Sequence, residues 1–369
     1  MTGIHIALAA ILTVLAATTA SVNTANAGTA SLTGDLPRRD GAPLVETAGL
    51  DTEYGAVLLS DGYRLRSMVT RPEGTNSRLP AIFVTQWVSC DGAEFEPPER
   101  YDRLRDLAQR SGWVLIRVDR AGAGDSEGPA CSELDYNTEV RHYREALDAL
   151  TRHAWVDPDR IVIYGISLGS TTAPLVASGK KIAGVMVQGA GAVTYLERMI
   201  NFDRIDLELS DKFPVERQHD EMLKRIRFQQ AYLLGRKTPS QVVADEPDLA
   251  GVWESLRGTD EPPHYGRPFA WHWQAAEKNF VAAWAAIDAP VLVIHGEYEQ
   301  FEPEHGHRLI VETVNAQRPG TATFVQISHA GHGLRIYGSK ADAYRFENGV
   351  SAPELFMQPV LGWLRGIEG

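Results

Sequence analysis

Short apolar runs alternate with stretches of helical periodicity between about residues 54 and 327, and this alternation limits the possible folds more than any other feature. The first two runs flank Ser60-Asp61-Gly62, which has the composition of a hairpin turn. Strands that alternate with helices form a mostly parallel sheet joined by right-handed crossovers. We therefore predict an α/β fold whose mostly parallel sheet is flanked by helices and begins with an antiparallel hairpin. The expected strands are residues 54–59, 63–70, 81–85, 113–118, 160–164, 182–188, 290–295 and 321–327.

One long interruption breaks the alternation. Residues 192–287 separate two expected strands, and this is far more chain than a simple crossover needs. The segment contains helical patterns and several aromatic residues, among them Trp271, Trp273 and Trp284. We predict that residues 47–191 and 288–369 form the core of one large domain, and that residues 192–287 form an inserted helical cap.

The first residues have the features of a secretory signal. Residues 4–17 are apolar apart from His5 and Thr13, and a small-x-small site ends at Ala27. This pattern predicts a signal peptide over residues 1–27 with cleavage after Ala27. An uncleaved anchor is the alternative, because no Lys or Arg precedes the apolar stretch, although that stretch is short for a bilayer span. We expect a secreted or periplasmic protein without a membrane span after cleavage, and a flexible segment over residues 28–46.

The charge of the chain narrows the range of partners. The formal net charge is −12, and no run of Lys or Arg interrupts the acidic balance. Such a surface repels phosphate backbones and anionic lipids. We therefore expect a small-molecule or short peptide substrate rather than nucleic acid or a charged membrane. The sequence leaves the oligomeric state open.

The clearest chemical motif is the pentapeptide GISLG at residues 165–169, which follows an apolar strand and precedes a helical stretch. A strand, a sharp turn and a helix are the context in which G-x-S-x-G forms a nucleophile elbow. The serine of an elbow has a strained backbone, and Gly165 and Gly169 would let strand and helix approach closely. The N–H of Leu168 would then face a developing oxyanion. We predict that Ser167 is a nucleophile; an ordinary Gly/Ser turn is the alternative.

With this elbow the chain resembles the α/β-hydrolase family from about residue 50 to the end. Residues 61–65 (DGYRL), followed by Arg71-Pro72, are similar to the entry region of the X-Pro dipeptidyl-peptidase and cocaine-esterase-like branch, and serine aminopeptidases are further relatives. Residues 119–128 (DRAGAGDSEG) resemble the glycine-rich loop after the fourth strand of this family. The resemblance implies an α/β-hydrolase fold and a triad in the chain order Ser, acid, His, with no metal or organic cofactor.

A serine hydroxyl needs a base that is held in the right tautomer by an acid. Family members usually carry G-x-x-D after the next-to-last strand, and this pattern places Glu299 at the acid position. Glu297 and Glu302 are alternatives, and a Glu in place of Asp adds one methylene of reach. A Gly-His pair after the last strand resembles the family's base position and indicates His332, with His329 as the alternative.

The second oxyanion donor is expected in the loop after residues 81–85. Many relatives carry His-Gly there, whereas this chain carries Gln86-Trp87. The dipeptidyl-peptidase branch uses a Tyr hydroxyl, but no Tyr stands in this loop. We therefore expect a backbone N–H of Trp87 or Val88 to be the donor.

The chain has two cysteines, Cys90 and Cys131, in loops that the expected fold brings to the same edge of the sheet. In an oxidising compartment they can form one disulfide, with two free thiols as the alternative. A bridge would tie the oxyanion loop to the loop after the fourth strand.

The segment from Glu302 to His307 has residue types found in metal sites, but its spacing matches no common zinc motif. We expect a helix N-terminus there.

The whole sequence is compatible with three functions. The first is a serine hydrolase that cleaves an ester through Ser167, His332 and Glu299. The second is a peptidase that holds a free amino group with cap carboxylates. The third is a non-catalytic binding protein on the same scaffold. The candidate cap carboxylates are Asp206, Glu208 and Asp211.

Overall fold

The computed structural model describes residues 29–39, 48–93, 98–189, 191–257 and 265–368. The predicted signal peptide, residues 1–27, lies outside this part of the chain. The described residues contain one sheet with the strand order β1-β2-β3-β5-β4-β6-β7-β8-β9. Its strands are β1 (Ser31–Thr33), β2 (Leu50–Leu58), β3 (Arg64–Pro72), β4 (Leu79–Thr85), β5 (Val114–Val118), β6 (Val156–Ile166), β7 (Gly184–Gln188), β8 (Val291–Gly296) and β9 (Ala322–Ile327).

The sheet is antiparallel at one end and parallel in the rest. The pairs β1–β2, β2–β3 and β3–β5 are antiparallel. All the pairs from β5–β4 to β8–β9 are parallel. The structure therefore confirms the predicted fold class and the antiparallel beginning. The helices of the core are α1 (Pro98–Ser111), α2 (Tyr136–Leu150), α3 (Gly169–Ala177), α9 (Phe280–Ala285), α10 (Glu304–Gln317), α11 (Lys340–Arg345) and α12 (Pro353–Glu368).

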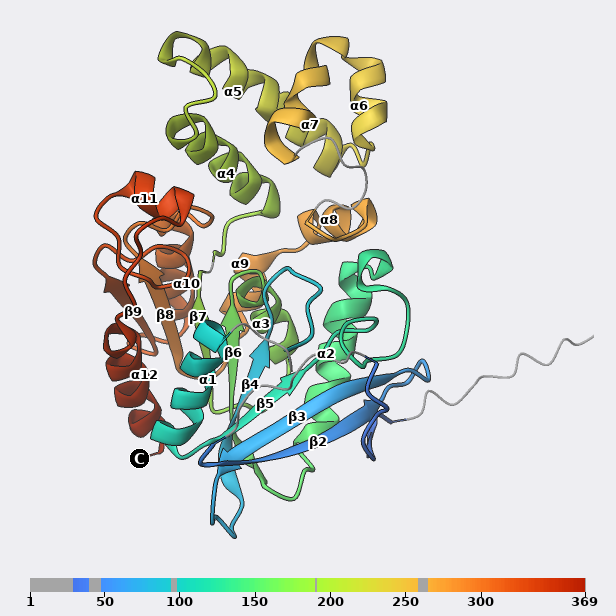
Figure 1. The fold of residues 1–369 in the computed structure, drawn as a ribbon, viewed down its shortest axis with the longest axis vertical. Helices are drawn as coiled ribbons and strands as arrows, with labels where there is room; N and C mark the ends of the chain where they lie inside the picture. Colours follow the sequence, from blue (N-terminus) through green and yellow to red (C-terminus); the bar gives the residue numbers. More distant parts are fainter. Residues whose placement is uncertain (1–28, 40–47, 94–97, 190, 258–264, 369) are drawn as a thin grey trace, which may run out of the picture.

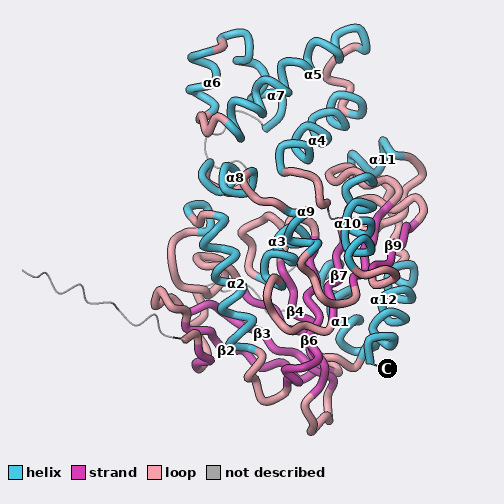
Figure 2. Tube along the Cα trace, turned by 180° about the vertical axis from the view of Figure 1, so that it is seen from behind, coloured by secondary structure: helices cyan, strands magenta, loops and turns pink. Residues whose placement is uncertain are grey.

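Successive side chains of a strand point to opposite faces of the sheet. Helices cover both faces of the central strands, so the side chains on each face are buried. Phe83 of β4 and Ile163 of β6 pack in a cluster with side chains of α2, α3, α9 and α10. Their neighbours Ile82 and Val162 pack in a second cluster with α1 and α12. In Figure 2, which shows the molecule from behind, α2, α3 and α10 lie in front of the strands.

In the described part of residues 192–287, helices form a cap beyond the carboxyl ends of the central strands, at the top of Figure 1. A largely aromatic cluster fills the cap; it includes Phe228, Tyr232 and Trp271 and continues to Tyr136 of α2 in the core. The helix that begins at Val215 continues beyond Gln229 as a π-helical turn over Gln230–Leu234 and ends at Gly235. The cap helices are α4 (Tyr195–Leu209), α5 (Val215–Gln229), α6 (Pro239–Asp245), α7 (Ala250–Arg257) and α8 (Phe269–Ala276).

The predicted cap boundary at residue 287 differs from the structure at α9. Trp284 of α9 is fully buried in the same cluster as the central strands. Because α9 contacts α3 and α10, it belongs to the helix layer of the core. A large apolar side chain is stabilised most where it leaves water completely, and this position lies against the sheet.

The predicted flexibility of residues 28–46 is wrong for their described part, residues 29–39. β1 pairs with β2 along the edge of the sheet. The backbone N–H of Arg39 donates to Asp125 at 2.6 Å, and the fully buried Asp125 also pairs with the fully buried Arg66 at 2.7 Å. These partners lie far away in sequence, so local composition does not reveal the contact. Among the described residues, no helix is both long enough and apolar enough to cross a membrane.

Candidate active site

The turn between β6 and α3 has the strained geometry of an elbow. Ser167 has a φ of 54°, a left-handed conformation that residues other than glycine rarely adopt. A Cβ on Gly165 would lie 2.6 Å from Cα of Ser170, and a Cβ on Gly169 would lie 2.0 Å from the carbonyl oxygen of Thr85. Close contact with β4 and α3 therefore requires glycine at both positions.

His332 lies between Ser167 and Glu299. Its Nε2 is 2.8 Å from Oγ of Ser167, and its Nδ1 is 2.8 Å from both carboxylate oxygens of Glu299. An ionised carboxylate only accepts hydrogen bonds, so Nδ1 carries the ring proton and Nε2 can accept from the hydroxyl. The structure thus brings together three residues that follow β6, β8 and β9, in the arrangement of a nucleophile, a base and an orienting acid.

Glu299 is poised to remain ionised. Its side chain is only 2% exposed. Burial raises its pKa, but the charge and hydrogen bond of His332 and the backbone N–H of Phe301 outweigh burial and lower the pKa to about 2. At neutral pH the carboxylate can therefore hold the imidazole and stabilise its protonated form.

The alternative acids and base have other partners. Glu297 accepts a hydrogen bond from the backbone N–H of His329 at 2.8 Å, and the ring of His329 stacks on Tyr298. Glu302 forms an ion pair with Arg198 of α4. Burial raises the pKa of Glu302 to about 7, although Arg198 opposes this shift. In the described part of the chain, no hydrogen bond joins either glutamate to His332, the histidine that contacts Ser167.

Two residues that the sequence did not indicate support His332. Gln188, the last residue of β7, donates from Nε2 to the carbonyl oxygen of His332 at 3.1 Å. Its Oε1 accepts from the hydroxyl of Tyr164 at 2.8 Å and from Arg103 at 3.0 Å. The ring of Phe301 contacts the imidazole edge-to-face, with centroids 4.7 Å apart. A polar residue at the end of a buried strand was the only sequence signal for Gln188.

The residues predicted to supply the oxyanion donors share one cavity. Leu168, Trp87 and Val88 all line the same cavity as Ser167. Within the described part of the chain, the N–H groups of Leu168 and Val88 have no hydrogen-bond partner. The N–H of Gln86, in contrast, donates to a tyrosine hydroxyl at 3.3 Å. Val88 therefore offers a donor on this loop, Trp87 stays the alternative, and the role of either in stabilising an oxyanion stays a prediction.

Cys90 and Cys131 form the disulfide that the sequence indicates. It joins the loop after β4 to the short 3₁₀ helix Cys131–Glu133, which follows the glycine-rich loop. The loop that carries Trp87 and Val88 is therefore covalently fixed at its far end.

A cavity of about 1070 Å³ opens above Ser167. Side chains of the core and of the cap both contribute to its walls, which are mainly apolar and aromatic. The space is large for a small-molecule site. The apolar and aromatic lining residues include Trp87, Leu104, Tyr195, Met199, Phe202, Phe301 and Phe356.

Carboxylates are scarce in this cavity. Asp106 is the one carboxylate among the described lining residues, and its Oδ1 lies 3.9 Å from the guanidinium of Arg105. The cap carboxylates proposed to hold a free amino group, Asp206, Glu208 and Asp211, are not among the lining residues. Asp206 instead pairs with Arg225 inside the cap at 2.9 Å.

The segment from Glu302 to His307 contains the N-terminus of α10, as predicted, with Pro303 at the N-cap. His307 is fully buried, and its Nδ1–H donates to the carbonyl oxygen of Pro303 at 3.0 Å. No three His, Cys, Asp or Glu side chains in the described ranges are grouped so that they could hold a metal ion.

Comparison with known proteins identifies the family and the fold of the chain. The model of the alpha/beta hydrolase family matches residues 85–345. A curated relative, the polyketide transferase ATR5 of Stachybotrys chlorohalonatus, is 32% identical over 133 residues, which cover 35% of this chain and 41% of that protein. The chain thus matches less than half of the length of that relative.

Solved structures share the fold at low identity. An esterase of Pyrococcus furiosus is 13% identical with a TM-score of 0.54, and the match covers 91% of this chain and 98% of that one. Est1E of Butyrivibrio proteoclasticus, solved with ferulic acid bound, is 14% identical with a TM-score of 0.54, over 85% of this chain and 98% of that one. At these identities the likeness concerns the fold alone.

Proposed function

Because this chain belongs to the alpha/beta hydrolase family, we propose that it is a serine hydrolase that cleaves carboxylic esters. The observation that carries the proposal is the position of His332, whose two ring nitrogens each lie 2.8 Å from their partners, Ser167 and Glu299. This arrangement supplies an activated hydroxyl and leaves a large cavity for the ester. No metal takes part in the proposed reaction.

The reaction proceeds in two halves. Oγ of Ser167 attacks the acyl carbon while Nε2 of His332 takes its proton, and the carbonyl oxygen becomes an oxyanion that the N–H groups of Leu168 and Val88 stabilise. The C–O bond of the ester then breaks, and His332 returns the proton to the departing alcohol. A water molecule, deprotonated by His332, attacks the acyl-enzyme and releases the acid and the free serine.

The walls of the cavity favour an ester with a bulky apolar or aromatic part. Tyr195, Met199 and Phe202 of α4 and Phe301 of the core offer apolar contacts on the cap side. A peptidase that releases N-terminal pieces would need a carboxylate to hold the free amino group. The single lining carboxylate, Asp106, lies near an arginine, so the cavity does not favour that alternative.

Parallel assays test this choice. We expect p-nitrophenyl esters of short aliphatic and of aromatic acids to be cleaved, and the Ser167→Ala variant to lose this activity. Alanyl and X-Pro p-nitroanilides should be poor substrates. Efficient cleavage of the anilides with little esterase activity would overturn the proposal in favour of a peptidase.

A second candidate is acyl transfer to an alcohol instead of water. It is favoured by the cavity, which extends from Met199 of the cap to Leu104 and Phe356 of the core and so has room beside an acyl group. The curated relative ATR5 carries the name polyketide transferase. In this reaction an acceptor hydroxyl attacks the acyl-enzyme and gives a new ester. Incubation with an ester and a bulky alcohol, followed by chromatography, distinguishes transfer from hydrolysis by the ratio of new ester to free acid.

We also propose that the enzyme acts outside the cytoplasm. The Cys90–Cys131 disulfide is consistent with an oxidising compartment, and the signal-like sequence ends at Ala27. Edman sequencing of protein secreted by a bacterial host should begin at Gly28. A mature protein that still begins at Met1 would support the uncleaved anchor instead.

A further inference from the structure

The oxyanion loop, residues 86–89, has all of its carbonyl groups bound by two buried arginines. Arg120 donates to the carbonyl oxygens of Gln86 at 2.9 Å, of Ser89 at 2.8 Å, and of Trp87. Arg267 donates from Nε to the carbonyl oxygen of Val88 at 3.0 Å. Arg120 belongs to the glycine-rich loop of the core, whereas Arg267 precedes α8 in the cap.

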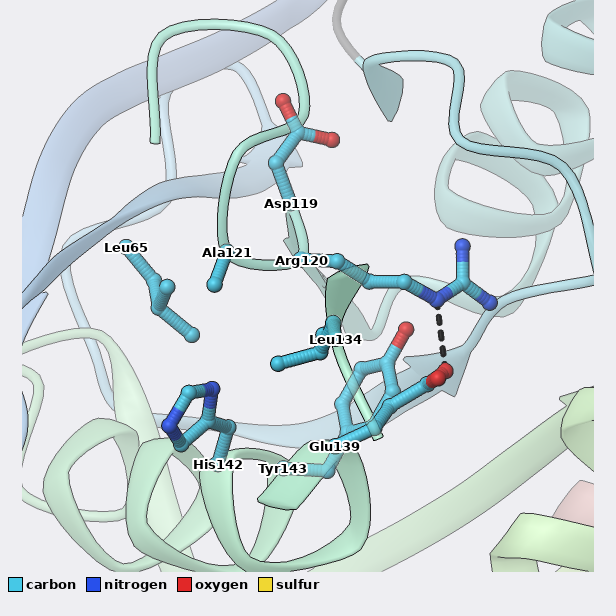
Figure 3. A pocket seen from close by; sticks show the side chains of 8 residues that line it. All are labelled: Leu65, Asp119, Arg120, Ala121, Leu134, Glu139, His142 and Tyr143. Carbon is cyan, nitrogen blue, oxygen red and sulfur yellow. Dashed lines mark hydrogen bonds and ion pairs between the residues drawn. The ribbon is translucent and has the colours of Figure 1, made fainter. Parts of the chain in front are cut away.

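One glutamate joins the two arginines. Glu139 in the first turn of α2 accepts from Nε of Arg120 at 2.6 Å, and its other oxygen lies 3.4 Å from Nη1 of Arg267. The indole N–H of Trp271 in α8 donates to the same oxygen at 2.8 Å. Figure 3 shows the side chain of Arg120 extended toward Glu139, with the bond between them dashed.

This arrangement fixes the direction of the loop's N–H groups. A trans peptide is planar, so its C=O and the following N–H point in opposite directions. The carbonyls of Gln86 and Trp87 point at Arg120, and the N–H groups of Trp87 and Val88 therefore point away from it. Since Trp87 and Val88 line the cavity above Ser167, their donors are held on the side where an oxyanion would form.

We propose that Arg267 of the cap, together with Arg120 of the core, positions the oxyanion loop, so that rapid acyl transfer to Ser167 requires the cap to be docked. The proposal rests on the proposed function. Both arginines act through the loop, and neither touches the substrate. Without Arg267 the carbonyl of Val88 loses its donor, and the peptide groups beside it can rotate away from the oxyanion.

The surroundings leave little room for substitution. The cavity that Arg120 and Glu139 line with Tyr143 and His142 measures only about 10 Å³, the size of a single water molecule. Arg120, Glu139 and Arg267 are each at most 3% exposed. Neighbouring side chains therefore cannot easily move into the space of a missing guanidinium.

The test compares two buried cap arginines. Arg267→Gln removes the contact with the oxyanion loop. Arg225→Gln is the matched control, because Arg225 is also fully buried in the cap and, like Arg267, pairs with a carboxylate, that of Asp206, and donates to a backbone carbonyl oxygen, that of Asp203. Arg267 additionally donates to the carbonyl oxygen of Cys131 at 3.4 Å. Both purified full-length variants are checked by circular dichroism and thermal unfolding, and kcat and KM are then measured with a p-nitrophenyl ester.

We expect Arg267→Gln to lower kcat about 100-fold, the size of effect that a misplaced group produces, with little change in KM. The inhibition constant of phenylboronic acid, which forms a tetrahedral adduct with the serine, should rise in parallel with the loss in kcat. Arg225→Gln should leave both quantities close to wild type. Arg267→Lys keeps the charge but not the fork of donors, so it should fall between wild type and Arg267→Gln.

Wild-type kcat and boronate affinity in Arg267→Gln would overturn the proposal, as would equal losses in the Arg225→Gln control. If Arg267→Gln does not fold, Arg267→Lys decides the question by the same two criteria. Failure of the proposed function is distinguishable, because the wild type itself would then cleave the ester poorly, or the Ser167→Ala variant would keep the esterase activity of the wild type.

Discussion

Two glutamates three positions apart differ in what surrounds their carboxylates. Glu299 accepts from His332 and from the backbone N–H of Phe301, and these interactions lower its pKa to about 2 in spite of burial. Glu302 is equally buried, and the charge of Arg198 does not offset the burial, so its pKa rises to about 7. Only Glu299 is therefore fully ionised at neutral pH and directed at the imidazole.

Glu299→Gln should lower kcat about 10⁴-fold, the effect of the equivalent change in the serine protease triad, because an amide can favour the wrong imidazole tautomer. Glu302→Gln is the matched comparison and should cost far less. Steady-state kinetics on one p-nitrophenyl ester measure both. A larger loss in Glu302→Gln would reassign the acid.

The stability of the protein in acid should depend on the ionisation of Glu299. Its pKa in the folded protein, about 2, is below the ordinary 4.5, so the ionised form stabilises the fold above pH 4.5. The contribution, about 3 kcal/mol for such a shift, is lost as the pH falls from 4.5 towards 2. The free energies of unfolding of wild type and Glu299→Gln should therefore converge over this range. A constant difference between the two would contradict the assigned pKa.

The parallel strands bring the parts of the site together. The oxyanion loop follows β4, the elbow follows β6, and the loops with Glu299 and His332 follow β8 and β9. Carboxyl ends of parallel strands share one edge of the sheet, so residues far apart in sequence meet there. The Cys90–Cys131 disulfide then ties the loop after β4 to the segment that follows the glycine-rich loop.

Reduction of the disulfide should affect stability and rate together. The bond closes a segment with a sequence separation of 41 residues, for which loop-closure entropy predicts roughly 4 kcal/mol of stabilisation. The paired change Cys90→Ala and Cys131→Ala should lower Tm, and it should lower kcat more than KM because the oxyanion loop gains freedom. An unchanged kcat at a lowered Tm would mean that the bridge serves stability alone.

Local sequence patterns predict the strands and the elbow well, because burial on both faces leaves continuous apolar runs and GISLG has few other uses in that context. They do not predict Arg267, Gln188 or the ordered segment 29–39. Each of these depends on a partner that is distant in the chain, and no period or motif marks such a contact. Glu299 and His332 were reachable only through the resemblance to a family, with alternatives that three-dimensional contacts then separate.

The cap and the core together form the walls of the cavity above Ser167. The aromatic rings of Phe202 in α4 and Phe301 in the core stack with centroids 5.2 Å apart at the wall of the cavity. Further contacts join cap and core beside the site, among them the ion pairs of Arg198 with Glu302 and of Arg267 with Glu139. If the proposed function holds, the position of the cap affects both the walls that contact the substrate and the loop that contains Trp87 and Val88.

Phe202→Ala should raise KM for aromatic esters with little change in kcat, because the ring contributes equally to binding the ground state and the transition state. Short aliphatic esters should be affected less. Phe213→Ala, which removes a cap aromatic outside the cavity lining, is the control. Equal effects on aromatic and aliphatic esters would argue against a substrate contact at Phe202.

The most direct measurement is covalent labelling with a fluorophosphonate probe, followed by peptide mapping. We predict rapid labelling of folded wild type, a mass shift confined to the peptide that contains Ser167, and no labelling of folded Ser167→Ala. Absence of labelling in folded wild type, which would indicate a binding protein, or a label on a different serine would contradict it.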